Sequence, residues 1–362
     1  MKIAFSTLGC PDFGWIDIYA MAKDFGFDGI EIRGLGKEIF AVKAPPFTES
    51  QLPATVEQLA RLDLEIPCLS SGCCLKFLEQ AEANYQEIVE YITLASKLGT
   101  PYVRILADQD PHPGDTVDDA VVLEALRRLI PVAEAKGVTL LVETNGVYAD
   151  TNRLRNLLDQ VGSDAVGALW DLHHPYRFAG EKPETTVQNL GAYIKYVHIK
   201  DSVVEDGVVK YKMMGEGDLP IDAMMRALRS INYEGYITLE WVKRWAPELS
   251  DAGVVFPHYA NFMERYLEKQ TVRGRLFDNK TKTGKYVWEK DTLIDLTFPQ
   301  VLDRMVEEFP HQYAFRYTTM DYTRTYAEFR EDVDTFARAL IALGVKPGDH
   351  VAIWATNVPQ WF

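Results

Sequence analysis

Four polar residues that could hold a metal ion each end a separate apolar run of the sequence. The runs read VTLLVETNG, AVGALWDLHHPY, IKYVHIKDS and GYITLEW, and the polar residues are Glu143, Asp171, His198 and Glu240. Each run is typical of a short buried strand that ends in a loop. Two Glu, one Asp and one His offer carboxylate and imidazole ligands to one divalent cation. The sequence therefore predicts a metal site, provided that the fold brings the four strand ends together.

The alternation of strand-like and helical segments predicts such a fold. Continuous Val, Ile and Leu runs fit strands that are covered on both faces. The predicted strands are KIAFS, DGIEIR, LEIPCLSS, PYVRIL, VTLLVE, AVGALWD, YVHIKD and GYITLEW. The predicted helices cover about 15–25, 81–98, 118–135, 150–161, 184–192, 221–231 and 257–267. Eight alternating strands predict an α/β protein with a (β/α)8 TIM barrel, whose strand C-termini converge on one mouth.

A metal at this mouth suits the chemistry of a hydroxy ketone. A divalent cation bound through the carbonyl and hydroxyl oxygens acidifies the C–H bond between them and stabilises the resulting enediolate. Glu143 and Glu240 end the fifth and eighth predicted strands, on different sides of the mouth. One of them could remove the proton from one face while the other returns a proton to the opposite face. The site therefore predicts an isomerase or epimerase with these two glutamates as its catalysts.

The segments around these residues match a known family in order and spacing. They are Glu143-Thr144-Asn145, Trp170-Asp171-Leu172-His173-His174, His198-Ile199-Lys200-Asp201, Gly215-Glu216-Gly217-Asp218 and Leu239-Glu240. Residues 1 to about 268 resemble the sugar phosphate isomerase/epimerase superfamily with the xylose-isomerase-like barrel. That superfamily also contains apurinic endonucleases, inosose dehydratases and ketose 3-epimerases. The resemblance implies that the four candidate ligands hold one divalent ion, often manganese, magnesium, cobalt or zinc.

Five further residues are candidates for contact with a small-molecule substrate or with the ligands. The resemblance to the epimerases implies that His174 bonds a substrate oxygen, although His173 could exchange roles with it. An amide or an amine at a strand end could orient carboxylates or substrate hydroxyls. Arginines near the ends of the second and fourth strands could meet an anionic group, or pair with acids inside the barrel. The candidates are His174, Asn145, Lys200, Arg104 and Arg33.

Other functions stay open at this stage. Isomerisation, epimerisation and dehydration share the enediolate step, so a dehydratase of the same family is an alternative. A catalytically idle barrel that serves as a scaffold or binding module is another. An endonuclease is disfavoured, because the formal net charge of -15 gives no basic footprint for nucleic acid and because few further histidines are available beyond His173 and His174.

A second unit is expected after Leu267. Residues 269–290 gather Lys, Arg, Gly, Asn and Thr, which predicts a linker, and 291–362 return to helix and strand patterns that end in the predicted strand HVAIWA. This part resembles the beginning of an acyl-CoA synthetase of the adenylate-forming (AMP-binding) superfamily. The matching segments are Thr325-Tyr326-Ala327-Glu328, Leu343 to Asp349, Val351-Ala352-Ile353 and Asn357-Val358-Pro359. No phosphate loop is present, so we expect no ligase activity and interpret the unit as an incomplete piece of a fused ligase domain.

Composition limits the setting of the chain. No stretch approaches the roughly 20 apolar residues of a membrane span, and the start MKIAFSTLGCPDFGW lacks a charged leader and a long apolar core. We therefore expect a cytoplasmic protein with no membrane partner, and its four cysteines as reduced thiols. The family resemblance implies that a homodimer is possible.

Overall fold

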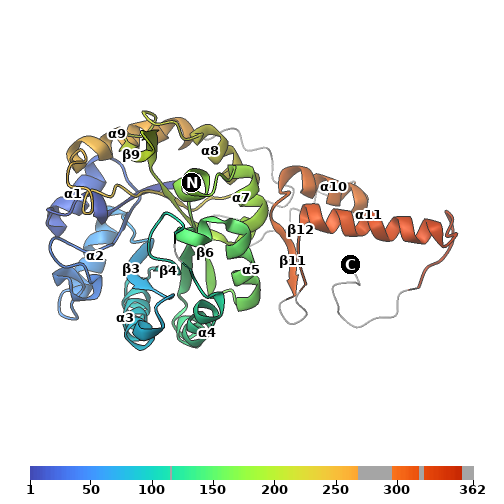
Figure 1. Cartoon of the computed structure of the whole chain (residues 1–362), viewed down its shortest axis with the longest axis horizontal. Helices are drawn as coiled ribbons and strands as arrows, with labels where there is room; N and C mark the ends of the chain where they lie inside the picture. The colour runs from blue at the N-terminus through green and yellow to red at the C-terminus, as the bar shows by residue number, and fades with distance from the viewer. Residues whose placement is uncertain (115, 268–295, 318–321, 353–362) are drawn as a thin grey trace.

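Eight parallel strands form the central sheet of the chain (Figure 1). The computed structural model describes all residues except 115, 268–295, 318–321 and 353–362. The order in the sheet is β2 (Gly29–Glu31), β1 (Lys2–Ser6), β10 (Tyr236–Leu239), β7 (Ile194–Ile199), β6 (Val166–Asp171), β5 (Thr139–Glu143), β4 (Tyr102–Leu106) and β3 (Cys68–Cys74). Isolated parallel bridges join the β2 and β3 edges, with Ile30 N–H donating to Glu65 O and Ser70 N–H to Ile32 O, both at 2.9 Å. The predicted TIM barrel is therefore confirmed.

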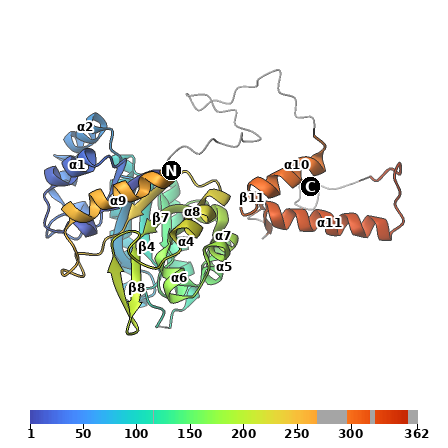
Figure 2. The same cartoon turned by 90° about the horizontal axis from the view of Figure 1, so that it is seen from above.

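Nine helices of the described barrel surround the strands (Figures 1 and 2). They are α1 (Trp15–Asp24), α2 (Leu52–Leu62), α3 (Ala81–Leu98), α4 (Asp119–Lys136), α5 (Thr151–Val161), α6 (His173–Phe178), α7 (Pro183–Leu190), α8 (Ile221–Ser230) and α9 (Ala252–Leu267). The α4 helix ends one residue beyond its predicted end, where Gly137 adopts a left-handed conformation. The sequence interpretation missed α2 and α6, began α9 five residues late and began β3 four residues early.

Six buried residues fill the barrel interior below the strand C-termini. They come from six of the eight strands and are Ala4, Cys68, Leu141, Leu169, Tyr196 and Tyr236. Layers of this kind make the inside of a TIM barrel a packed core. The Tyr196 ring lies 5.8 Å from the His198 ring, so this layer forms the floor on which the polar residues of the mouth rest.

A hairpin that the sequence interpretation missed follows β7. It consists of β8 (Asp201–Glu205) and β9 (Val208–Lys212), joined through Asp206 and Gly207, both at positive φ. Two such residues are typical of a tight hairpin turn. The buried Asp201 carboxylate accepts hydrogen bonds from the N–H groups of Gly215 (2.9 Å) and Gly217 (3.0 Å). A Cβ at Gly217 would overlap this carboxylate, so the loop after the hairpin depends on both residues.

The C-terminal unit contains α10 (Phe298–Glu308), β11 (Tyr313–Tyr317), β12 (Tyr322–Thr325) and α11 (Tyr326–Ala342). Figures 1 and 2 show it beside α5 and α7 of the barrel, where Arg155 lies 3.4 Å from Glu328. The predicted linker 269–290 lies outside the described residues. The predicted strand HVAIWA lies partly outside them, and its described part, 350–352, is not a strand. In the parts of the chain that the structure describes, no helix has the length and apolar character to span a bilayer.

Candidate metal and substrate site

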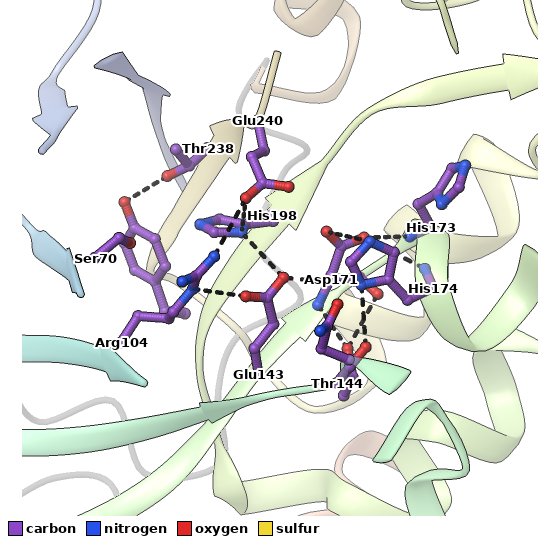
Figure 3. Close-up of polar contacts among 12 residues, drawn as sticks. Ser70, Arg104, Glu143, Thr144, Asp171, His173, His174, His198, Thr238 and Glu240 are labelled. Carbon is purple, nitrogen blue, oxygen red and sulfur yellow. Dashed lines mark hydrogen bonds and ion pairs between the residues drawn. The ribbon is translucent and has the colours of Figure 1, made fainter. Parts of the chain in front are cut away.

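The four predicted ligands meet at the mouth of the barrel (Figure 3). Glu143 and Asp171 are the last residues of β5 and β6, His198 lies near the end of β7, and Glu240 directly follows β10. One ligand atom from each lies within 4.8 Å of the others, and all four side chains are buried. Residues far apart in sequence are thus brought together because parallel strands end at one rim.

His198 is held by a carboxylate that the sequence interpretation missed. Its Nε2 lies 2.6 Å from Oε2 of Glu31, the last residue of β2, and Oε1 of Glu31 accepts a hydrogen bond from the Ser70 hydroxyl at 2.9 Å. The other ring nitrogen, Nδ1, is buried without a hydrogen-bond partner and lies 3.5 Å from Glu240 Oε1 and 3.8 Å from Glu143 Oε1. A carboxylate behind a histidine fixes the ring so that the opposite nitrogen can bind a metal.

Two cations hold the glutamates in their ionised form. Arg104 Nε lies 2.6 Å from Glu143 Oε2, and Lys200 Nζ lies 2.5 Å from Glu240 Oε2 while also contacting Asp171. Burial alone would raise the pKa of Glu143, but the charges of Arg104 and His198 outweigh it and hold that pKa well below its usual range. Lys200 and His198 likewise lower the pKa of Glu240 against the effect of burial. Both carboxylates are therefore charged at neutral pH.

The charges and donors of this cluster fit one divalent cation. Its carboxylates are Glu31, Glu143, Asp171 and Glu240, and its permanently charged cations are Arg104 and Lys200. With His198 neutral, as a metal-binding imidazole is, four negative and two positive charges leave an excess that one divalent ion balances. The unpartnered Nδ1 of His198 supplies a nitrogen donor beside three carboxylates, a set that suits zinc, manganese or cobalt. The residues present therefore fit a metal.

Asp171 is oriented from both sides. Its Oδ1 accepts hydrogen bonds from the N–H groups of His173 (2.8 Å) and His174 (3.3 Å) at the start of α6, and its other oxygen contacts Lys200. His174 is buried beside the cluster, with Nε2 3.5 Å from Asp171 Oδ2 and Nδ1 3.8 Å from Glu143 Oε1. Burial lowers the pKa of His174, which favours a neutral ring. His173 instead faces Ser202 Oγ at 2.9 Å, so His174 is the histidine nearer to the ligands.

A cavity of about 180 Å³ opens above the cluster. Its lining includes Glu143, Glu240, His174, Lys200, Arg104, Asn145 and Arg33, together with Tyr211 from the missed hairpin and Trp245. Every predicted substrate-contact residue therefore lies at this one cavity. Asn145 donates from Nδ2 to the main-chain oxygens of Asp108 (2.8 Å) and Gln109 (3.1 Å), which anchors the loop at the rim. The volume is below the roughly 300–1,000 Å³ of drug-sized sites, which favours a small substrate.

Comparison with known proteins agrees with this architecture. The sequence profile described as xylose isomerase-like TIM barrel matches residues 19–256, which is more than half of the chain. The chain belongs to the xylose isomerase-like TIM barrel family. The resemblance predicted for the first 268 residues is therefore confirmed.

Members of this family that the chain resembles include sugar epimerases. Fructoselysine 3-epimerase of Escherichia coli O157:H7 is 27% identical over 262 residues, which is 68% of this chain and 93% of that protein. Inosose dehydratase of Clostridium perfringens is 26% identical over 166 residues, 41% of this chain and 53% of the dehydratase. The prediction of an isomerase- or epimerase-like enzyme is confirmed at this level, with a dehydratase as a related possibility.

Solved structures of xylose isomerase-like proteins share the fold. That of L-ribulose 3-epimerase has a TM-score of 0.59 and 19% identity, covering 74% of this chain and 94% of the epimerase. The IOLI protein with a binding zinc atom has a TM-score of 0.58 and 17% identity, covering 74% of this chain and all of that one. At these identities the likeness shows the barrel fold alone.

The C-terminal unit matches a different family over a short segment. The profile described as AMP-binding enzyme matches residues 302–362. A putative acyl-CoA synthetase of Bacillus subtilis (strain 168) is 35% identical over 69 residues, 19% of this chain and 13% of the synthetase. The second predicted resemblance is thus confirmed for this segment, which spans a small part of the synthetases it matches.

Proposed function

We propose that the barrel moves a proton at the carbon next to the carbonyl group of a small hydroxy-carbonyl compound, such as a ketose, and thereby isomerises or epimerises it. The observation that carries the proposal is the pair of buried, ionised glutamates on strands that two others separate, β5 and β10, around a cluster that fits a divalent ion. The 27% identity to fructoselysine 3-epimerase over most of the barrel supports it.

Each part of the cluster has a separate task in this reaction. A divalent ion bound by Glu143, Asp171, His198 and Glu240 supplies charge stabilisation for an oxygen that becomes negative when the neighbouring C–H bond breaks. Glu143 and Glu240 approach the substrate from different strands, so each serves one face of the reacting carbon. The glutamate that removes the proton acts in its ionised form, and the other must first take up a proton from water before it can return one; the configuration of the substrate decides which does which. If one glutamate removes the proton and the other returns one, the configuration of that carbon is inverted. If the same glutamate does both, the original configuration is restored.

The neighbouring side chains keep the two glutamates ready. Arg104 and Lys200 each contact one catalytic carboxylate and so fix its orientation. We infer that these two cations position the glutamates, because both are already engaged with acids. His174 lines the cavity with a neutral ring close to Glu143 and Asp171, which supports contact with a substrate oxygen.

Proton exchange in deuterated water tests the proposal. The manganese-, cobalt- or zinc-loaded protein is incubated with ketoses in D2O, and nuclear magnetic resonance follows loss of the C–H signal beside the carbonyl. Glu143→Gln and Glu240→Gln should each lower epimer formation at least about 100-fold, as expected for loss of a general acid-base group. Glu216→Gln, an exposed glutamate in the loop after the hairpin, serves as the matched control. Wild-type rates in both site variants would refute the glutamate roles.

A dehydratase is the second candidate, supported by the 26% identity to inosose dehydratase. The first proton transfer is the same, and a hydroxyl on the adjacent carbon then leaves as water. Nuclear magnetic resonance of the products separates the two reactions. Dehydration removes one water molecule from the substrate, whereas an epimer keeps the formula of the substrate. A barrel that serves only as a scaffold would show no metal-dependent exchange with any ketose or inosose.

A further inference from the structure

Arg33 is a cation at the mouth of the cavity that forms no ion pair with the carboxylates of the described residues. Its main-chain N–H donates to the Thr7 hydroxyl at 2.9 Å, which fixes the backbone just beyond β2. Its guanidinium donates to the Ile39 carbonyl at a long 3.4 Å and lies 5.9 Å from the centre of the Trp245 ring. Within the described ranges of the chain, no carboxylate forms an ion pair with it.

The other cations of the same cavity are already neutralised. Arg104 is paired with Glu143, and Lys200 with Asp171 and Glu240. Among the described cavity-lining residues, Arg33 is therefore the cation whose charge is left for a ligand. Burial lowers the pKa of Arg33 and the charge of Arg104 lowers it further, against a smaller opposite effect of Glu87, and a guanidinium stays protonated in proteins. A partly buried charge without a carboxylate in ion-pair contact costs free energy that a bound anion recovers.

The surroundings of Arg33 leave its donors usable. Gly72 lies against Nη2, and a side chain at this position would crowd the guanidinium, with a Cβ only 2.8 Å from that nitrogen. Trp245 is 56% exposed at the rim, and its ring contacts the guanidinium without taking up an N–H donor. Glu143 and Glu240 line the same cavity, so one small molecule can reach both Arg33 and the catalytic glutamates.

We propose that Arg33 binds the anionic end of the substrate, and that the substrate is a hydroxy-carbonyl compound with a carboxylate remote from the reacting carbon. This substrate class rests on the proposed function, which supplies the proton transfer by Glu143 and Glu240 in the same cavity. A carboxylate matches the single charge of one guanidinium and can accept two of its N–H groups side by side. A phosphate, with about two negative charges, would place an excess charge near Glu143 and Glu240.

Calorimetric titration with three matched ketoses tests the proposal. D-fructose, D-fructuronate and D-fructose 6-phosphate share one carbon frame and differ in their C6 group, which is neutral, a carboxylate or a phosphate. The metal-loaded protein should bind the carboxylate about 10- to 100-fold more tightly than D-fructose, as expected for charge-assisted hydrogen bonds. Arg33→Gln should remove this preference, so that the variant binds D-fructuronate no more tightly than D-fructose, while Arg33→Lys should retain part of it. Metal content and thermal unfolding should match the wild type in both variants.

The outcomes separate this proposal from the proposed function. Equal binding of the acid and the neutral ketose, no binding of the acid, or a preference that survives Arg33→Gln overturns the anion site, even if metal-dependent exchange persists. Tighter, Arg33-dependent binding of the 6-phosphate overturns the choice of a carboxylate. Conversely, an Arg33-dependent preference for the acid in a protein that exchanges no substrate proton supports the anion site and contradicts the proposed reaction.

Discussion

Replacing Glu31 by Gln should weaken metal binding without removing any ligand. Glu31 Oε2 lies 2.6 Å from His198 Nε2, and the whole side chain is buried. Gln keeps the size of the side chain and an oxygen that can accept from Nε2–H, but it removes the negative charge that makes the imidazole a stronger donor at Nδ1. Loss of such a carboxylate behind a metal-binding histidine typically lowers metal affinity about 10- to 100-fold.

The lower metal affinity of Glu31→Gln should also reduce the free energy of unfolding of the metal-loaded protein. At equal metal concentration, a dissociation constant that rises about 10- to 100-fold removes about 1.4 to 2.7 kcal/mol of the stabilisation that bound metal provides. Competition with a fluorescent chelator for manganese, cobalt and zinc measures the affinity. Thermal unfolding with and without metal measures the stability and shows whether the metal-free variant folds.

A second carboxylate far from the ligands provides the control for Glu31→Gln. Glu181 is half-buried and accepts hydrogen bonds from the hydroxyls of Thr151 and Thr186, outside the cavity lining. Glu181→Gln should leave the affinity for metal unchanged. Wild-type affinity in Glu31→Gln, or an equal loss in both variants, would refute the role of Glu31 behind His198.

Three further perturbations test the packing around the site. Lys200→Met should destabilise the metal-free protein by about 3–5 kcal/mol in urea unfolding, because it takes the closest cation from two buried carboxylates, and added metal should restore part of the loss; an unchanged midpoint would contradict the pairing. Asp201→Asn should cost about 1–3 kcal/mol through lost acceptors for the loop at Gly217, also read from urea unfolding. Arg155→Ala should cost less than about 1 kcal/mol, because its pair with Glu328 is long, at 3.4 Å, and still partly exposed to solvent, and a larger loss would show a stronger contact between the two units.

The strand ends that carry the ligands could be predicted from sequence because each combines an apolar run with a single polar terminus. Glu143, Asp171 and Glu240 end such runs, and a closed parallel barrel leaves only one rim where they can meet. The meeting of the ligands at one site therefore follows from the closure of the parallel strands into a barrel.

Residues outside this pattern were harder to predict. Glu31 ends a strand of only three residues, and its acidic side chain in DGIEIR could equally be a solvated surface group. It is buried because His198, 167 residues later in the chain, faces it across the barrel, and no local pattern reports such a pair. Tyr211 had a usable signal, since Asp206-Gly207 between two valine-rich segments is typical of a hairpin. The partnering of Arg104 and the lack of a partner at Arg33 depend on side-chain geometry alone.

Native mass spectrometry of the purified protein, beside a Glu143→Gln/Glu240→Gln double variant, tests the central claim most directly. The cluster of Glu143, Asp171, His198 and Glu240 predicts one divalent ion per wild-type chain after incubation with manganese, cobalt or zinc, and its loss in the double variant. A wild-type chain that takes up no ion, or a double variant that retains it, would contradict the placement of the metal in this cluster.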